Sequence, residues 1–371
     1  MRQRQQRKQE QGFSLVELLI VMFIFSIIIA VVFESYIVQL KHTTREYKVA
    51  ETEIETGIAK GIIERDLYMA GYGIADDYAG IIFVPTPKAV AATNDNPDTL
   101  TLMGTALGLK SRAAQGWSYM TAANAAAAPA TASFQTWSDA REDVKANDVV
   151  ILINPSTKKL LDDGLGGWQF YYNGTGGNVT IGSVAGGIAY STPSIGTLAY
   201  GLYTSGDTPA ANVPYYAVRY YLGGTPPSNC AAGTQSLLRA ESRNTTSPVC
   251  GTWPCGGDPI LDCVLDFEVA FGLDTLTAKG DGPINIWDPG GATIAAGYSQ
   301  KDLLTRLKQI RLYILVQSGN YDPNYTSPFT SIWVGDSTLG TGRDVTLDTT
   351  NRQRNYRWKL ISISITPRNI K

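Results

Sequence analysis

The clearest pattern in the chain is an apolar run near its N-terminus. Between Phe13 and Phe33 only Ser14, Glu17 and Ser26 are polar. The run has the length of about 20 residues that a helix needs to span a bilayer. Residues 1–12 carry four basic residues and one acidic residue, and acidic residues follow the run. This charge bias predicts a single-pass helix with a cytoplasmic N-terminus and the bulk of the chain outside.

The helical pattern continues beyond Phe33 with a narrower apolar face. Apolar residues now recur at steps of three and four, and polar residues fill the other faces: Tyr36, Leu40, Tyr47, Ala50, Ile54, Ile58 and Ile62. The first proline is Pro85. We therefore expect one helix over 13–70, roughly 85 Å long at about 1.5 Å per residue. Residues 13–33 form its membrane half, and 34–72 an amphipathic half that ends at the glycines after Ala70.

The rest of the chain, residues 73–371, reads as strands and loops without strand–helix repeats. The strands expected are Thr99–Met103, Asp148–Ile153, Tyr215–Leu222, Leu237–Glu241, Val264–Gly272, Leu307–Gln317 and Arg357–Ile365. The last two alternate with a period of two, which indicates one buried and one solvated face. The predicted fold class is α+β, with the long helix packed on a large, loop-rich antiparallel β head. A doubly wound nucleotide-binding fold is not expected.

Composition supports an exported, β-rich protein. The 371 residues include 37 glycines and 20 tyrosines, and only 17% are charged. The net charge of −2 gives no reason to expect a nucleic-acid partner. Residues from about 80 to 230 form a variable insertion rich in glycine and tyrosine. We interpret 164–206 as long hairpin loops, with a binding surface as the alternative, because tyrosine on glycine-rich loops offers contact area.

The four cysteines lie close together in the sequence. They are Cys230, Cys250, Cys255 and Cys263, and an even count in an exported domain predicts two disulfides. Three pairings are open. The preferred one is Cys230–Cys250 with Cys255–Cys263, because short loops close most easily. A four-cysteine zinc site is the alternative, although the spacings fit zinc knuckles poorly.

The sequence offers little catalytic chemistry. Its one histidine, His42, cannot build a Ser-His-acid triad or a histidine-rich zinc centre. Phosphate-binding and dinucleotide-binding glycine motifs are missing from the sequence. We expect a non-enzymatic protein without a cofactor. A weak calcium candidate is the acidic loop with Asp274, Asp281 and Asp288, because calcium prefers several oxygen ligands.

Glu17 is the informative residue in the apolar run. A carboxylate inside a membrane span is costly unless it is paired or functional. It stands in the sequence Gly12-Phe13-Ser14-Leu15-Val16-Glu17, directly after the basic leader. This segment resembles the class III signal of type IV prepilins and of type II secretion pseudopilins.

The resemblance implies a specific processing route. A membrane prepilin peptidase would cut after Gly12, remove leader 1–12 and methylate Phe13. Because the cut precedes the apolar segment, the mature chain would keep its helix. Glu17 would pair with the Phe13 amine of a neighbouring subunit, which would remove the cost of a lone buried charge. The chain would thus be a single-pass inner-membrane protein before it enters a fibre.

Later segments resemble PilW-type minor pilins. They are the helix end at Glu64–Tyr72, the strands Asp266–Gly272 and Leu307–Val316, and the closing strand Tyr356–Ser362 with its tail Pro367–Asn369. The resemblance covers roughly residues 1–75 and 235–371. It implies a subunit that helps to initiate type IV pilus assembly at or near the pilus tip. Its expected partners are other minor pilins, the major pilin, the inner-membrane assembly platform and a tip adhesin.

Two other functions remain open. A minor pseudopilin of a type II secretion system would have the same N-terminus. A pilus-anchored surface adhesin would use the pilin stalk only as an anchor and would bind through the tyrosine-rich insertion. Whether such a fibre serves twitching motility, attachment or DNA uptake is left open by the sequence.

Overall fold

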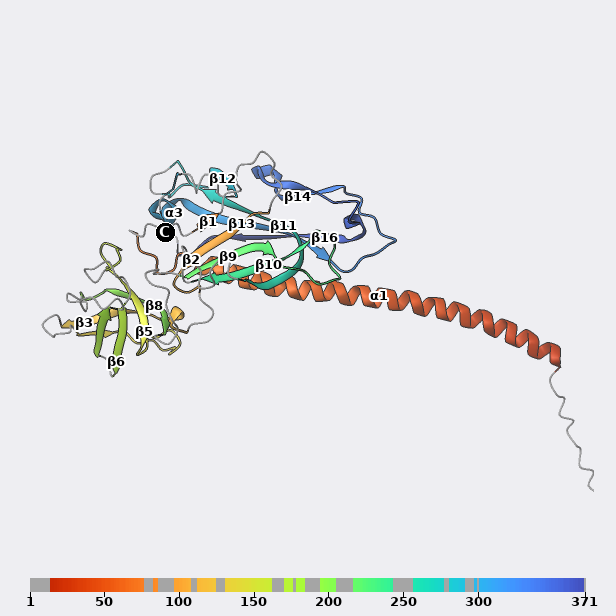
Figure 1. The fold of residues 1–371 in the computed structure, drawn as a ribbon, viewed down its shortest axis with the longest axis horizontal. Coiled ribbons are helices and arrows are strands. Elements are labelled where there is room, and N and C mark those ends of the chain that lie inside the picture. The colour runs from red at the N-terminus through yellow and green to blue at the C-terminus, as the bar shows by residue number, and fades with distance from the viewer. Residues whose placement is uncertain are drawn as a thin grey trace, which may run out of the picture. The chain divides into compact units, whose positions relative to one another are not determined.

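The computed structural model describes residues 14–76, 83–85, 97–107, 112–124, 131–161, 170–175, 178–183, 194–204, 216–242, 256–276, 280–290, 297–298 and 300–369. The chain divides into two compact units, Met1–Thr52 and Glu53–Lys371. In its described residues, the first is the N-terminal part of the long helix. The second contains the rest of that helix and all the strands (Figure 1).

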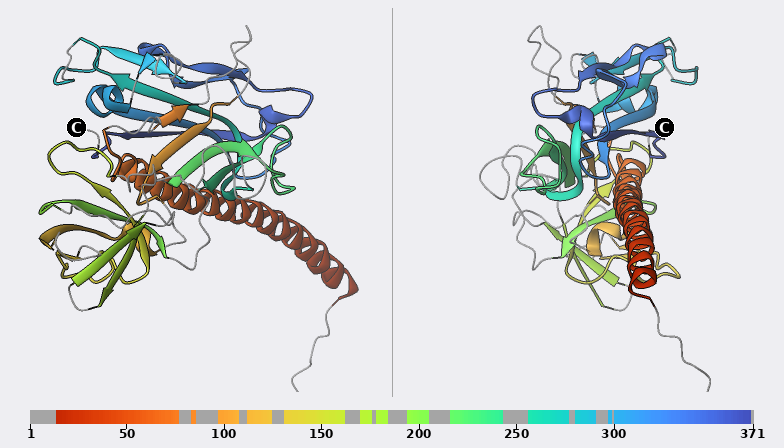
Figure 2. Two further views of the ribbon diagram at one scale, coloured as in Figure 1. Left: turned by 60° about the vertical axis from the view of Figure 1, so that its left-hand side comes forward. Right: turned by 90° about the vertical axis from the view of Figure 1, so that its right-hand side faces the viewer.

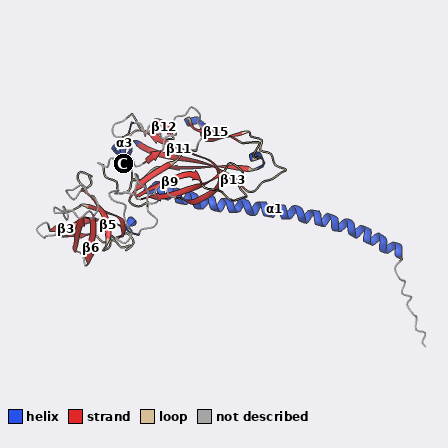
Figure 3. Cartoon of the chain, viewed as in Figure 1, coloured by secondary structure: helices blue, strands red, loops and turns tan. Residues whose placement is uncertain are grey.

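The long helix α1 spans Leu15–Met69, in agreement with the prediction (Figure 3). It ends where Gly71 adopts a φ of 80°, a left-handed conformation that glycine reaches without strain. The Gly71 N–H donates to the carbonyl of Met103, 2.8 Å away. The chain therefore leaves the helix directly onto the sheet.

The head is built on an eight-stranded antiparallel sheet. Its order is β1-β2-β9-β10-β11-β13-β16, and β12 pairs with β11 beside this path. The strands are β1 (Phe83–Pro85), β2 (Leu100–Gly104), β9 (Tyr216–Gly223), β10 (Gln235–Ser242), β11 (Asp258–Leu273), β12 (Ile286–Pro289), β13 (Leu307–Ser318) and β16 (Arg357–Ile365). The short helix α3 (Gln300–Arg306) precedes β13, and β14 (Ser331–Asp336) forms a hairpin with β15 (Thr341–Thr346). The α+β fold class is confirmed, and six of the seven predicted strands lie in this sheet; the seventh, Asp148–Ile153, is also a strand but lies outside it.

The middle of the chain forms a closed barrel rather than long loops. Its order is β3-β4-β7-β6-β5-β8. The strands are β3 (Trp117–Asn124), β4 (Thr131–Phe134), β5 (Asp148–Ile153), β6 (Phe170–Thr175), β7 (Asn178–Ser183) and β8 (Leu198–Thr204). Three of these strands fall within 164–206, so the prediction of hairpin loops there was wrong. Its short, glycine-bearing segments hid the strands, and barrel closure pairs them.

The barrel also corrects the limits of the insertion. It lies between β2 and β9, which are hydrogen-bonded neighbours, with Gly104 opposite Tyr216. The inserted segment therefore falls between residues 104 and 216. The wider estimate of 80–230 also takes in three strands of the large sheet, β1, β2 and β9.

The central strand β13 is covered on both of its faces. On one face, Leu312 and Ile314 belong to the main core together with Ile63 of α1. The end of α1 runs along this sheet (Figure 2). On the opposite face, Leu315 packs with Val334 of β14. The prediction of a solvated face was therefore wrong for β13, because the β14–β15 hairpin covers it.

The same prediction was right for the last strand, β16. Ile361, Ile363 and Ile365 are buried on one face, and the residues between them are exposed on the other. A strand of this kind has one face in the core and one in solvent, as its period-two pattern indicated.

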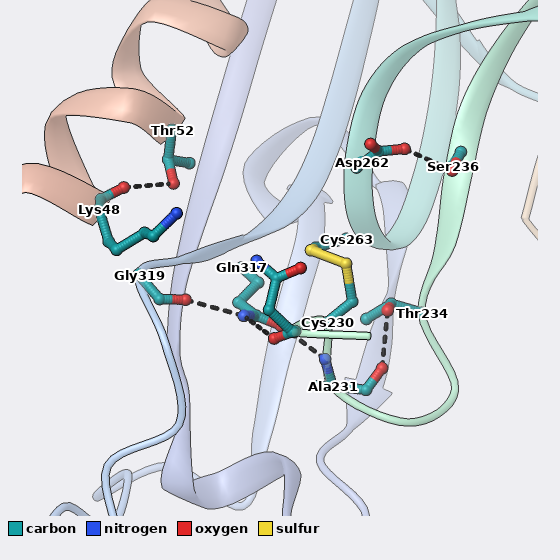
Figure 4. The surroundings of a disulfide bond; sticks show 11 residues. Lys48, Thr52, Cys230, Ala231, Thr234, Ser236, Asp262, Cys263, Gln317 and Gly319 are labelled. Carbon is teal, nitrogen blue, oxygen red and sulfur yellow. Dashed lines mark hydrogen bonds between the residues drawn. A yellow bond between two sulfur atoms is a disulfide. The ribbon is translucent and has the colours of Figure 1, made fainter. Parts of the chain in front are cut away.

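The disulfide differs from the preferred pairing. Cys230 is bonded to Cys263, with their Cα atoms 5.0 Å apart (Figure 4). Pairing of β10 with β11 places Gln235 opposite Val264, and so draws Cys263 towards the segment before β10. The register of the two strands, rather than the length of the loop, therefore determines which cysteine pairs with Cys230. The bond also contradicts a four-cysteine zinc site, and Cys250 and Cys255 lie outside the described residues.

The disulfide is held against the buried amide of Gln317 on β13. Gln317 accepts from the Ala231 N–H at 2.7 Å and donates to the Gly319 carbonyl at 2.7 Å (Figure 4). Its Nε2 also donates to the Asn229 carbonyl at 3.1 Å. The turn that carries Cys230 is thus tied to two strands of the sheet.

Removing this bond is expected to destabilise the head. The double variant Cys230→Ser/Cys263→Ser should lose about 2–4 kcal/mol of unfolding free energy, because the bond restricts the unfolded chain. Urea unfolding of the purified chain in detergent measures this loss. If the two cysteines are bonded to each other, either single variant should lose about as much as the double variant. If the losses of unfolding free energy in the two single variants add up to the loss in the double variant, the pairing is contradicted.

Candidate functional site

The N-terminal part of α1 presents apolar side chains on every side. Leu15 is 77% exposed, Phe23 is 66% exposed and Phe33 is 63% exposed. Among the described residues, α1 is the one helix that is long and apolar enough to cross a membrane. Every residue from 14 to 47 is exposed within the described chain, so the apolar area of this segment is available to lipid or to other helices.

Ser14 and Glu17 cap the start of α1. The Ser14 N–H donates to Glu17 Oε2 at 3.0 Å, and Ser14 Oγ accepts weakly from the Val16 N–H at 3.4 Å. Glu17 thus reaches back to the N–H of the cap residue, as in a capping box, while the Ser14 hydroxyl caps the Val16 N–H of the first turn. A negative charge in the first turn also interacts favourably with the helix dipole. Glu17 thus has a local structural role in the single chain.

Ser26 is the other polar residue within the apolar segment. Its hydroxyl donates to the Phe23 carbonyl at 2.7 Å, one turn earlier in the same helix. A serine that bonds to its own helix needs no outside partner in an apolar medium. Glu17 is the one charged residue of the described segment 14–33, and unlike Ser26 it would need a counter-charge in an apolar medium.

The second part of α1 has a buried stripe. Thr56, Ala59, Ile63 and Leu67 are buried at steps of three and four residues, and Asp66, next to Leu67, is buried too. Ile54 and Ile58, which the sequence pattern placed on the apolar face, are instead exposed. Ala59, Ile63 and Leu67 belong to the core formed with the large sheet. This stripe attaches residues 53–69 to the head.

Asp66 carries a buried charge in the middle of this contact. Its Oδ2 accepts from Tyr220 Oη at 2.6 Å and from Arg239 Nε at 2.7 Å. Asp66 and Tyr220 are fully buried, and Arg239 is 6% exposed. Arg239 also donates through Nη2 to the Leu107 carbonyl at 3.0 Å, and Nη1 lies 3.4 Å from Glu241. The helix is thus joined to the adjacent strands β9 and β10 by charged hydrogen bonds.

The surroundings fix the charge states of this cluster. Burial, together with the charge of Asp66, raises the pKa of Tyr220 well above its ordinary value. Burial alone lowers the pKa of Arg239, but the hydrogen bond and charge of Asp66 outweigh it and raise that pKa. Tyr220 therefore remains a neutral donor and Arg239 a cation at neutral pH.

The C-terminal tail closes the other end of the contact. Asn369 Nδ2 donates to the Tyr68 carbonyl at 2.8 Å, near the end of α1 where carbonyls have no helical partner. The Arg368 guanidinium lies 4.8 Å from the centre of the Tyr68 ring. Lys359 pairs with Glu53 at 2.5 Å, but both side chains are exposed, so this ion pair adds little stability.

The predicted site residues fall into three groups. Gly12 and Phe13 lie outside the described residues, and Glu17 lies in the first turn of α1. Asp274 is buried and accepts from the Leu276 and Gly282 N–H groups, so it organises its own loop. Across the described part of the chain, no three or more His, Cys, Asp or Glu side chains gather as a metal site, and this includes the calcium candidates Asp274, Asp281 and Asp288.

Comparison with known proteins adds one specific finding. A family model described as the prokaryotic N-terminal methylation motif matches residues 7–33. The match includes Gly12, Phe13 and Glu17, so the chain carries this motif. No curated protein matches the chain. A solved type IV-like pilin from Thermus thermophilus is similar over 86% of this chain and 96% of its own, at 10% identity and a TM-score of 0.33.

Replacing Asp66 tests the helix–sheet contact. Asp66→Asn removes the nearer of the two carboxylates that face the buried Arg239, leaves only Glu241 at 3.4 Å, and should reduce the unfolding free energy by about 3–5 kcal/mol. Urea unfolding of the purified chain measures this change. The matched double variant Asp66→Asn/Arg239→Met, which removes both charges, should be more stable than Asp66→Asn alone. A single variant as stable as the native chain would contradict a structural role for this charge.

Proposed function

We propose that this chain is a pilin-like filament subunit, and more specifically a PilW-type minor pilin that helps to initiate type IV pilus assembly. The observation that carries the proposal is the methylation motif at the start of a 55-residue helix. A cut after Gly12 would leave that helix on the mature chain. A subunit anchored in this way can move from a membrane into a fibre without losing its apolar segment.

The proposed roles of Gly12 and Phe13 follow from the methylation motif, and that of Glu17 follows from its charge. Gly12 directs cleavage by a prepilin peptidase, and Phe13 becomes the methylated N-terminus. Glu17 then faces an apolar environment in which a lone carboxylate is costly. Pairing with the Phe13 amine of a neighbouring subunit would offset that cost and set the axial position of one helix against the next.

The size of the head supports a minor role and a position near the tip. Residues 53–371 form one compact unit in which the large sheet carries an inserted barrel. A bulky head is hard to repeat along a thin fibre. Before assembly the chain would lie in the inner membrane, and its partners would be the major pilin, other minor pilins and the assembly platform.

The barrel favours an adhesin as the second candidate function. It is inserted between two neighbouring strands of the sheet, and its own core includes Met120, Val150 and Phe170. If the chain is an adhesin of this design, deleting its gene should reduce attachment and leave the number of fibres unchanged. If it is a type II secretion pseudopilin, the deletion should instead reduce protein secretion.

Glu17 offers a test that separates charge pairing from helix capping. Deleting the gene should sharply reduce the number of surface fibres, and the native chain should restore it. Glu17→Gln keeps an acceptor for the Ser14 N–H but has no charge for an amine, so we expect it to be processed and not to restore fibres. Fibres are counted by electron microscopy, and the chain is quantified in sheared fibres.

The matched control for this test is Ser14→Ala. It removes the hydroxyl that accepts from Val16 and keeps the charge of Glu17. We expect this variant to restore fibres nearly as well as the native chain. Full restoration by Glu17→Gln, or unchanged fibre number in the deletion strain, would contradict the assembly role.

A further inference from the structure

The two edges of the large sheet are protected differently. The edge at β1 is three residues long and ends at Pro85, which cannot donate a backbone hydrogen bond. The edge at β16 is nine residues long, contains no proline, and pairs residue by residue with β13 without a register shift. Among the described residues, no strand pairs with the other side of β16.

Such an edge is a template for another strand. Alternate N–H and C=O groups of β16 point away from β13 and can pair with an added chain. Natural proteins usually protect long edges with prolines, bulges or charged side chains. In β16 the charged residues Arg357 and Lys359 lie at the start of the strand, and residues 360–365 contain none.

The side chains of this segment are self-complementary. Ile361, Ile363 and Ile365 are buried on the face towards the core, while Leu360, Ser362 and Ser364 are exposed on the other face. In an antiparallel pair of two such strands with Ser362 at the two-fold axis, Ile361 of each copy lies opposite Ile363 of the other. Isoleucine then meets isoleucine on one face, and serine meets serine at the axis of the other.

The charges at the start of the strand favour the same arrangement. Arg357 pairs with Asp322 at 3.1 Å, and Lys359 pairs with Glu53 at 2.5 Å. A parallel partner would place like charges side by side, which is unfavourable. An antiparallel partner places Lys359 opposite Ile365 and Arg357 opposite Pro367, so neither residue faces its own counterpart.

We propose that the outer edge of β16 binds β16 of a second copy of this chain, in an antiparallel pairing that joins the two large sheets. The interface is backbone hydrogen bonding along residues 360–365, with Ser362 at the axis. It does not depend on the proposed function, because it needs neither cleavage nor a fibre.

A charge-swap experiment on the full chain in detergent tests this interface. The native chain is expected to be a dimer by analytical ultracentrifugation. Ser362→Lys and Ser362→Glu each place like charges opposite one another at the axis, and each should raise the dimer dissociation constant at least about tenfold. An equal mixture of the two variants should restore the dimer as a Lys–Glu heterodimer.

The matched controls are Ser337→Lys and Ser337→Glu, at an exposed serine in the short helical turn after β14. They should leave the dimer unchanged. A native chain that stays monomeric, Ser362 variants that stay dimeric, or a mixture that fails to recover would each overturn the proposal. Dimers that persist in the Ser362 variants would assign the contact to another surface, such as α1.

A second measurement covers the case in which charge at position 362 disturbs folding. Under oxidising conditions Ser362→Cys should give a disulfide-linked dimer, because directly opposite Cβ atoms lie about 4.5–5.5 Å apart. Ser337→Cys should not. Equal cross-linking of both variants, or of neither, would overturn the proposed pairing.

Discussion

The contact between Asp66 and Arg239 fixes the relation of helix to sheet within the head. Asp66 is one residue before Leu67 and three after Ile63, so its carboxylate lies on the face of α1 that packs into the core. A rotation of the helix by one residue, about 100°, would carry that carboxylate away from Arg239 and Tyr220. A buried charge without its partner is strongly destabilising, so this one pair specifies how the apolar stripe meets the sheet.

One helix therefore meets two different environments along its length. Over residues 14–33 its apolar side chains are exposed on all sides, and the polar residues Ser14, Glu17 and Ser26 form hydrogen bonds within this same segment. Over residues 53–69 one stripe of the helix is buried against the sheet, while Ile54 and Ile58 are exposed on another face. The first arrangement suits an apolar medium, and the second suits the surface of a folded domain in water. This division is what a subunit anchored by its N-terminus requires.

The sequence predicted the elements whose pattern is local. The helix over 13–70 and the strands Leu307–Gln317 and Arg357–Ile365 follow from period and length alone. The barrel was missed because β6 and β7 are short and contain Gly174 and Gly182, so their strand character depends on pairing with each other. Disulfide pairing was misjudged for the same reason, since strand register outweighed the length of the loop between Cys230 and its partner.

The candidate site was predictable only at its N-terminal end. Gly12, Phe13 and Glu17 form a contiguous motif, and the family match covers all three. The partners of Asp66 are 154 and 173 residues away in the sequence, and nothing in the local pattern connects them. The segment Glu64–Tyr72 resembles the helix end of PilW-type minor pilins. Only the fold shows its physical role, which is the contact of Asp66 with Tyr220 and Arg239.

The most direct test of the central claim is the N-terminal mass of the mature chain, measured in membranes and in sheared surface fibres. If the chain is a processed pilin-like subunit, the chain in the fibres should begin at N-methylated Phe13. That result would join the methylation motif, the retained helix and filament assembly in one observation. A chain that still begins at Met1, and is found only in membranes of cells with active prepilin peptidase, would contradict the account and leave a signal-anchored exported domain.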